Sequence, residues 1–288
     1  MIDQQIRNFI SHMPGFSTTG IKVMEVCNRP ATSSHDLNRV ISLDPVLTGK
    51  VLKLVNSAYY SLGKEVTSLT HALILLGINT VKNLALSTAI LESIGGRDSF
   101  RCLSMDDFWV HSLGVGVISR SFARLTGIPA MEEEGYFVAG LLHDLGKIPL
   151  NYCYPEMYNS ALEAANLEQT TLYEAEKTYL GLDHCTVGGW IAEKWRLHRD
   201  FSDVFHFHHD QESSGREKCH FLVIASLANL YANYWKIGSA GDTTPNHPLM
   251  EHLQKRLNIE SAQIAANHDN VLEDIDKARI FLKVATEG

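Results

Sequence analysis

Paired cysteines are missing from this sequence. The five cysteines are odd in number, lie far apart and never form a CxxC pair; they are Cys27, Cys102, Cys153, Cys185 and Cys219. This usage argues against a disulfide framework and against a zinc site built from cysteines. Any bound metal would therefore be held by imidazole and carboxylate groups, which suit iron, zinc, manganese or nickel.

An excess of basic residues and long apolar runs are also missing. The 25 Lys and Arg residues against 33 Asp and Glu residues give a formal net charge of −8, a poor match for nucleic acid bound through its phosphates. The chain has no uninterrupted run of about 18 apolar residues, and its N-terminus lacks a basic segment followed by an apolar one. We therefore expect a cytoplasmic protein that binds neither nucleic acid nor a membrane.

The sequence also lacks the residue pattern of β-strands. No segment sustains an alternation of apolar and polar residues between hairpin turns, whereas apolar residues recur at helical spacing along most of the chain. Asp44 can cap a helix predicted over residues 45–57, because Pro45 fits its first position. Gly77 interrupts a later apolar pattern and predicts two helices with a short joint. The sequence thus predicts an all-α fold.

A division of the chain is predicted at residues 95–99, where GGRDS places two glycines and polar residues directly after a long apolar helix. We therefore expect an N-terminal helical subdomain over residues 1–96. Residues 97–288 are expected to form a helical bundle with a C-terminal helical extension. A long loop is predicted over residues 238–248.

Histidine is abundant, with 14 residues in the chain. The stretch GLLHDLGKIPL places His143 and Asp144 side by side in an apolar run, and Lys147 follows one helical turn later. An isolated pair of this kind is most often two polar residues in a helical core. Four further histidines stand near it on other predicted helices: His111, His184, His208 and His209. Convergence of several imidazoles and a carboxylate from separate helices is what a divalent ion needs, so these residues favour a metal site. His206 is expected at the surface.

The order of these residues resembles the ligand order of HD-domain metal phosphohydrolases, and more closely that of their HD-GYP branch, which degrades cyclic di-GMP. The segments MPGFSTTGIKVMEV, VISLDPVLTGKVLKLVNSAYYSLGKEVTSLTHALILLG and FWVHSLGVG together resemble the HDOD family, the HD-related output domain of bacterial signalling proteins. The resemblance covers roughly residues 10–235. It implies an N-terminal helical subdomain packed beside an HD-like helical bundle.

The chain differs both from HDOD proteins that have lost the HD ligands and from active HD enzymes. Many HDOD proteins have lost the HD ligands and act as interaction or regulatory modules, whereas this chain keeps His143 and Asp144. Active HD enzymes carry a closing aspartate where IASLAN places Asn229, and the HHE..GYP signature is replaced by HHDQESSG. Asparagine lacks the charge that aspartate gives to an ion, which speaks against full activity. Asp107, one helical turn before His111, can add a second carboxylate.

Two functions follow from these residues. The first is a regulatory signalling module that binds a partner protein or a phosphorylated small molecule and keeps an occupied metal site without full turnover. The second is a metal-dependent phosphohydrolase acting on a nucleotide, a cyclic dinucleotide or a phosphate ester, with Asp144 and Lys147 as catalytic residues. In both, one or two divalent ions are held by His111, His143, Asp144, His184, His208 and His209. We favour the first, although the two are not exclusive.

Overall fold

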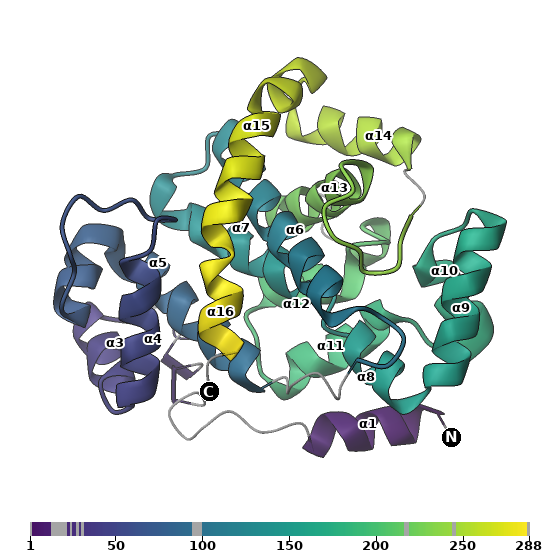
Figure 1. Ribbon diagram of the computed structural model, residues 1–288, viewed down its shortest axis with the longest axis horizontal. Coiled ribbons are helices and arrows are strands. Elements are labelled where there is room, and N and C mark those ends of the chain that lie inside the picture. Colours follow the sequence, from purple (N-terminus) through teal and green to yellow (C-terminus); the bar gives the residue numbers. More distant parts are fainter. Residues whose placement is uncertain are drawn as a thin grey trace.

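The computed structural model describes residues 2–12, 22–23, 25–26, 29, 32–93, 100–215, 219–243 and 246–286. Helices and the turns between them make up these ranges, and no strand occurs within them, which confirms the all-α prediction (Figure 1). The division predicted at residues 95–99 lies outside the described residues. The two-domain boundary at residue 96 therefore stays a prediction.

The first part of the chain contains four helices whose bounds lie in its described residues, and two of them start or bend where the sequence predicts. The four are α1 (Ile2–His12), α3 (Ser34–Ile41), α4 (Pro45–Val55) and α5 (Leu69–Ser93). The carboxylate of Asp44 accepts hydrogen bonds from the first N–H groups of α4, at 3.0 Å from Val46 and from Leu47. α5 bends at Gly77, whose φ of 78° and ψ of 165° are not helical, so this element is the predicted pair of helices.

In the described part of the chain, α5 is the one helix long and apolar enough to cross a membrane by length and composition, over Leu69–Leu91. Within the fold 61% of this segment is buried. It packs against α3, α4 and the helices over Ala130–Leu142 and Ile280–Thr286. Burial on most sides together with the bend at Gly77 is typical of a core helix.

The remaining helices form a bundle beside α3, α4 and α5. They are α6 (Met105–Leu125), α7 (Ala130–Leu142), α8 (Lys147–Cys153), α9 (Pro155–Glu168), α10 (Leu172–Leu180), α11 (His184–Lys194), α12 (Arg199–Phe207), α13 (His220–Tyr234), α14 (His247–Leu257), α15 (Ser261–Ala278) and α16 (Ile280–Thr286), with a short 3-10 turn over Glu212–Ser214. α6, α7 and α13 cross at the centre of the molecule (Figure 1). The predicted loop over residues 238–248 is shorter than expected, since α14 already begins at His247.

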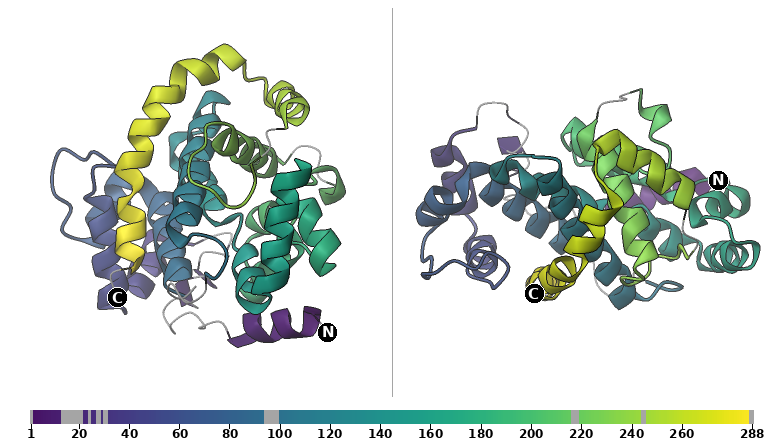
Figure 2. Two further views of the ribbon diagram at one scale, coloured as in Figure 1. Left: turned by 45° about the vertical axis from the view of Figure 1, so that its right-hand side comes forward. Right: turned by 90° about the horizontal axis from the view of Figure 1, so that it is seen from above.

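The two ends of the chain tie the parts of the fold together. α15 and α16 run back across the bundle to reach the N-terminal helices (Figure 2). There the ring of Phe281 lies 5.4 Å from that of Tyr59 and 4.7 Å from that of Phe137, measured between centroids. α1 packs on the opposite side, against α8 and α11. The apolar core is therefore continuous from α4 through α7 to α16.

Candidate metal centre

Three helices and the turn between α7 and α8 bring four of the predicted histidines together. His143 and Asp144 stand in the turn between α7 and α8, because α7 ends at Leu142 in the middle of the bundle. His111 comes from α6, His184 from the first position of α11, and His208 from the end of α12. All five side chains are buried, with at most 3% of any of them exposed. The prediction that these residues converge in a helical core is met.

Two of the rings are held by main-chain carbonyls. Nδ1 of His143 lies 2.7 Å from the carbonyl oxygen of Gly140, and Nδ1 of His208 lies 2.9 Å from that of Val204. Since a carbonyl only accepts, Nδ1 carries the proton in both rings and Nε2 keeps its lone pair when the ring is neutral. Metal-ligating histidines are fixed by outer hydrogen bonds of this kind.

A buried carboxylate holds the third ring. Oε2 of Glu176, on α10, lies 2.6 Å from Nδ1 of His184 and also accepts the main-chain N–H of His184 at 2.8 Å. The side chain of Glu176 is 0% exposed. A carboxylate behind an imidazole fixes the ring and raises its basicity as a ligand. Glu176 therefore acts on the centre through His184.

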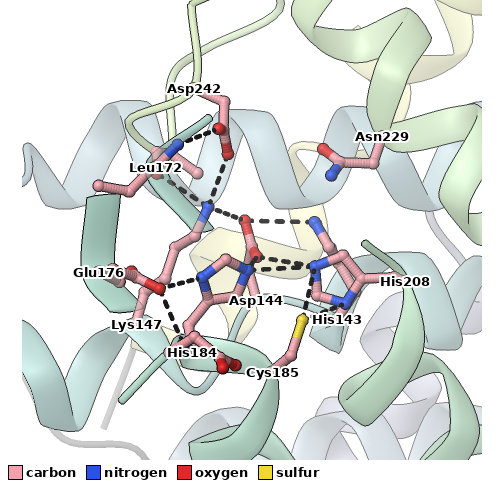
Figure 3. A network of polar contacts seen from close by, with 12 residues as sticks. His143, Asp144, Lys147, Leu172, Glu176, His184, Cys185, His208, Asn229 and Asp242 are labelled. Atoms are coloured by element: carbon pink, nitrogen blue, oxygen red, sulfur yellow. Dashed lines mark hydrogen bonds and ion pairs between the residues drawn. The ribbon is translucent and has the colours of Figure 1, made fainter. Parts of the chain in front are cut away.

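The Nε2 atoms of these three rings meet at Asp144 (Figure 3). Nε2 of His143 lies 3.2 Å from Oδ2 of Asp144, whereas Nε2 of His184 and of His208 lie 3.3 and 3.5 Å from Oδ1. The two Nε2 atoms of His184 and His208 are 3.3 Å apart. Oδ1 of Asp144 and Nε2 of His143 lack a hydrogen-bond partner among the described residues. A set of converging lone pairs around one carboxylate fits a divalent ion of the imidazole-binding kind.

Lys147 lies in the same cluster, but its ammonium is fully engaged. Nζ donates to Oδ2 of Asp144 at 2.8 Å, to the carbonyl oxygen of Ala240 at 3.0 Å and to Oδ2 of Asp242 at 3.3 Å. An ammonium has three N–H donors, so all of them are used. Asp242 is fixed in turn, because its Oδ1 accepts the N–H of Leu172 at 2.8 Å (Figure 3). The predicted role of Lys147 in holding a phosphate stays a prediction.

Three predicted contributors have other surroundings, although a ligand atom of His111 lies within 4.8 Å of one each of His143 and Asp144. Nε2 of His111 lies 3.9 Å from Oδ2 of Asp144, and its hydrogen-bond partner is the amide oxygen of Asn229 at 3.0 Å. His209 stacks on the ring of Tyr173, with centroids 5.0 Å apart, and its Nε2 has no hydrogen-bond partner among the described residues. The predicted addition of Asp107 is wrong, because its side chain is exposed at the start of α6, one turn away from the buried end of the cluster.

The surface prediction for His206 is confirmed, since its side chain is exposed. Reasoning from the sequence missed Glu176, Asp242 and Cys185. Cys185 is 3% exposed, and its Sγ lies 3.6 Å from Nδ1 and 3.8 Å from Nε2 of His208. Its place directly after His184 was a signal for contact with the cluster, but a spacing of one residue is not typical of ligands on a helix.

Burial and charge keep one side of the cluster in its ligating form. Burial opposes ionisation of Asp144, yet its contact with His143 and the charge of Lys147 outweigh it and hold the pKa of this carboxyl well below its usual range. Burial lowers the pKa of His143, and burial next to His143 lowers the pKa of His111 to about 4. Neutral imidazole beside ionised carboxylate is the state that binds a metal ion.

The other side of the cluster attracts positive charge. Burial disfavours the charged form of His208, but Cys185 and Asp144 outweigh it and raise the pKa of His208 to about 9. For His184 the carboxylate of Glu176 likewise outweighs burial and raises the pKa well above its usual value. Protons occupy this side when no other cation does, and a bound ion would displace them.

Gly146 sets the distance between the turn that carries Asp144 and the start of α11. A Cβ at this position would overlap the carbonyl oxygen of His184 and lie 2.7 Å from the main-chain nitrogen of Gly188. Since both neighbours are backbone, Gly146→Ala must push α8 and α11 apart. We expect it to lower the free energy of unfolding in urea by about 2–3 kcal/mol.

Gly49, exposed in α4 with nothing within 4 Å of its Cβ position, supplies the control. Gly49→Ala is expected to raise the free energy of unfolding by about 0.5–1 kcal/mol, because alanine favours the helix. Equal stabilities for the two variants would contradict the close approach of the two helices at Gly146.

Comparison with known proteins concerns the family and the fold of the chain. Residues 13–211 match the family model of the HDOD domain. An uncharacterized protein of Treponema pallidum (strain Nichols) is 23% identical over 258 residues, which are 90% of this chain and 48% of that protein. The chain thus spans about half the length of this curated relative.

Solved structures share the whole fold. An HDOD domain protein with unknown function from Geobacter sulfurreducens has a TM-score of 0.78 at 24% identity, over 98% of this chain and 99% of that one. A protein of Shewanella amazonensis SB2B, provisionally named a phosphohydrolase, has a TM-score of 0.74 at 19% identity, over 98% of both chains. A protein of Marinobacter aquaeolei VT8, provisionally named a signal transduction protein, has a TM-score of 0.72 at 15% identity, over 99% of this chain and 66% of that one. At these identities the likeness concerns the fold.

Proposed function

The chain belongs to the HDOD domain family, and from this premise we propose that it is a regulatory module whose buried centre holds a divalent metal ion without turning over a substrate. One observation carries the proposal. The candidate ligands are oriented toward one another, yet the cluster is closed to solvent, since His143, Asp144, Lys147 and His184 are all 0% exposed. A centre of this kind can hold an ion but cannot receive a substrate without rearrangement of the fold.

The ligand set supports occupancy by a metal. Imidazole nitrogens of His143, His184 and His208 surround one ionised carboxylate, and each ring is fixed through its other nitrogen. A bound divalent ion would supply the positive charge that balances these groups. Because its ligands come from the α7–α8 turn, α11 and α12, its binding energy would add to the stability of the fold.

Turnover has less support from the same residues. Lys147 donates its three N–H groups to Asp144, Ala240 and Asp242, so none remains for a phosphoryl oxygen. Asn229 faces His111 with a neutral amide where active relatives carry a carboxylate to orient water. The phosphohydrolase alternative therefore requires the segment around Asp242 to move away before chemistry.

The surface supports a signalling role that involves a partner protein. Ile74, Leu75 and Met131 are exposed by 75%, 48% and 56%, and they border a cavity of about 420 Å³ beside the bend of α5 at Gly77. Clustered apolar side chains on a protein surface commonly mark interaction sites. The provisional name of the M. aquaeolei protein, a signal transduction protein, agrees with this role.

Elemental analysis and activity assays on the same preparation test the proposal. We expect about one iron, zinc, manganese or nickel ion per chain after purification with added metal. The loaded protein should hydrolyse no member of a panel of nucleotides, cyclic dinucleotides and phosphate esters. Trace metal alone would refute the occupied centre. Hydrolysis that His143→Ala abolishes would replace the regulatory role with the phosphohydrolase alternative.

A further inference from the structure

We infer that the thiolate of Cys185 is a ligand of the metal, together with His184, His208 and Oδ1 of Asp144. The inference rests on the metal binding proposed above and goes further, because it adds a sulfur ligand and places the ion on one side of the carboxylate. Cys185 follows His184 at the start of α11, where both side chains reach the cluster from the end of the helix.

The spacing of the ligand atoms supports a four-coordinate set. A tetrahedral ion with bonds of about 2.0–2.1 Å to nitrogen or oxygen and about 2.3 Å to sulfur places neighbouring ligand atoms about 3.3–3.6 Å apart. Nε2 of His184 lies 3.3 Å from Nε2 of His208, and Oδ1 of Asp144 lies 3.3 and 3.5 Å from these two nitrogens. Sγ of Cys185 lies 3.8 Å from Nε2 of His208. One ligand atom each of His184, Cys185 and His208 lies within 4.8 Å of the others.

The two oxygens of Asp144 have different surroundings. Oδ2 already accepts the ammonium of Lys147 at 2.8 Å, a cation that repels a second one. Oδ1 has no hydrogen-bond partner among the described residues and points between His184 and His208. The ion is therefore assigned to the Oδ1 side, where Cys185 lies, rather than to the side of His111 and His143.

Charge gives a second argument for the thiolate. Among HD enzymes the closing aspartate supplies an anionic group, but Asn229 stands there in this chain and its amide oxygen is taken by His111. Among the described residues, Asp144 is then the one carboxylate in direct reach of a dication, because Asp242 pairs with Lys147 and Glu176 lies behind His184. The thiolate of Cys185 would supply a second negative charge among the direct ligands.

A sulfur ligand determines which metals the centre accepts. Thiolate and imidazole favour zinc, iron(II) and cobalt(II), whereas magnesium, calcium and manganese prefer oxygen ligands. From the four predicted metals, the inference thus selects zinc or iron. It disfavours manganese, which prefers oxygen ligands, and nickel, which prefers square-planar or tetragonal sites to a tetrahedral one.

Cobalt(II) provides the test, because a thiolate ligand gives a charge-transfer absorption band in the near ultraviolet that nitrogen and oxygen ligands do not give. The full chain is loaded with cobalt(II), bound cobalt is counted by elemental analysis, and the spectrum is recorded. We expect the band in the unaltered protein and its loss in Cys185→Ser, with cobalt binding weakened at least about 10-fold. Cys153→Ser, which removes a half-buried thiol from α8 outside the cluster, is the control and should keep the band.

The outcomes separate the inference from the proposal beneath it. Bound cobalt without the band, or a band that survives Cys185→Ser, overturns the thiolate ligand and leaves the metal centre in place. A band lost in Cys153→Ser but kept in Cys185→Ser also overturns it. A chain that binds no cobalt, zinc or iron overturns both the ligand and the occupied centre.

Discussion

Lys147→Met is expected to lower the free energy of unfolding of the metal-free protein by about 3–5 kcal/mol. The ammonium of Lys147 lies 2.8 Å from Asp144 and 3.3 Å from Asp242, and its own side chain is 0% exposed. Methionine fills a similar volume but leaves two buried carboxylates without their cation. Urea unfolding at neutral pH in the presence of a chelator measures the loss.

Lys177→Met is the matched control. Lys177 pairs with Glu174 at the same i,i+3 spacing and at 3.3 Å, but the two side chains are 41% and 57% exposed. Exposed pairs contribute about 1 kcal/mol or less, so this variant should stay close to the unaltered protein. The difference between the two variants should shrink as the pH falls, because Lys147 helps to hold the pKa of Asp144 well below its usual range and protonation of Asp144 removes its uncompensated charge. Equal losses at neutral pH would show that Lys147 does not compensate a buried charge.

Local signals in the sequence were enough to predict where two of the helices start or bend. Asp44 and Pro45 start α4 as predicted, because a cap and a first-turn proline act within one helical turn. The bend of α5 at Gly77 is also a local effect, because glycine adopts a positive φ that other residues rarely adopt. The histidines that meet around Asp144 are among those singled out in the sequence, from their places on separate predicted helices and from the resemblance of the chain to a family.

The partners of those histidines could not be predicted in the same way. Glu176 reaches His184 across two helices, and Asp242 reaches Lys147 across 95 positions of the chain. The spacing of residues within one helix does not predict contacts between different helices. The same limit explains the error at Asp107, where shared helical phase with His111 suggested a common site, although the side chain of Asp107 is exposed in the first turn of α6 while that of its neighbour Phe108 is buried.

The role predicted for Lys147 differs most from its surroundings in the fold, because its side chain is buried. From the sequence it is a cation one turn from His143 and Asp144, suited to hold a phosphate. In the fold it is sealed in the core and bonded to both Asp144 and Asp242. A sequence pattern gives the direction of a side chain on its helix, but exposure depends on what the rest of the chain packs over it.

Zinc is expected to stabilise the protein, and His208→Ala should remove this effect. At a free zinc concentration 100 times the dissociation constant, binding to the folded state alone adds about 2.7 kcal/mol to the free energy of unfolding. Loss of a residue that hydrogen-bonds a metal ligand weakens metal binding by up to roughly 100-fold, and loss of a direct ligand should weaken it at least as much. At the same zinc concentration the stabilisation by zinc would then fall to about 0.4 kcal/mol. Thermal unfolding with and without zinc measures both shifts.

His206→Ala controls for the loss of an imidazole from the same helix. His206 is exposed at the end of α12, two residues before His208, so it offers zinc a ligand only in the unfolded chain or at the surface. We expect this variant to keep the whole zinc shift. If both variants lost it equally, zinc would be acting on the surface of α12. If neither lost it, the ion would bind without His208, and the tetrahedral set that includes Cys185 would be excluded along with it.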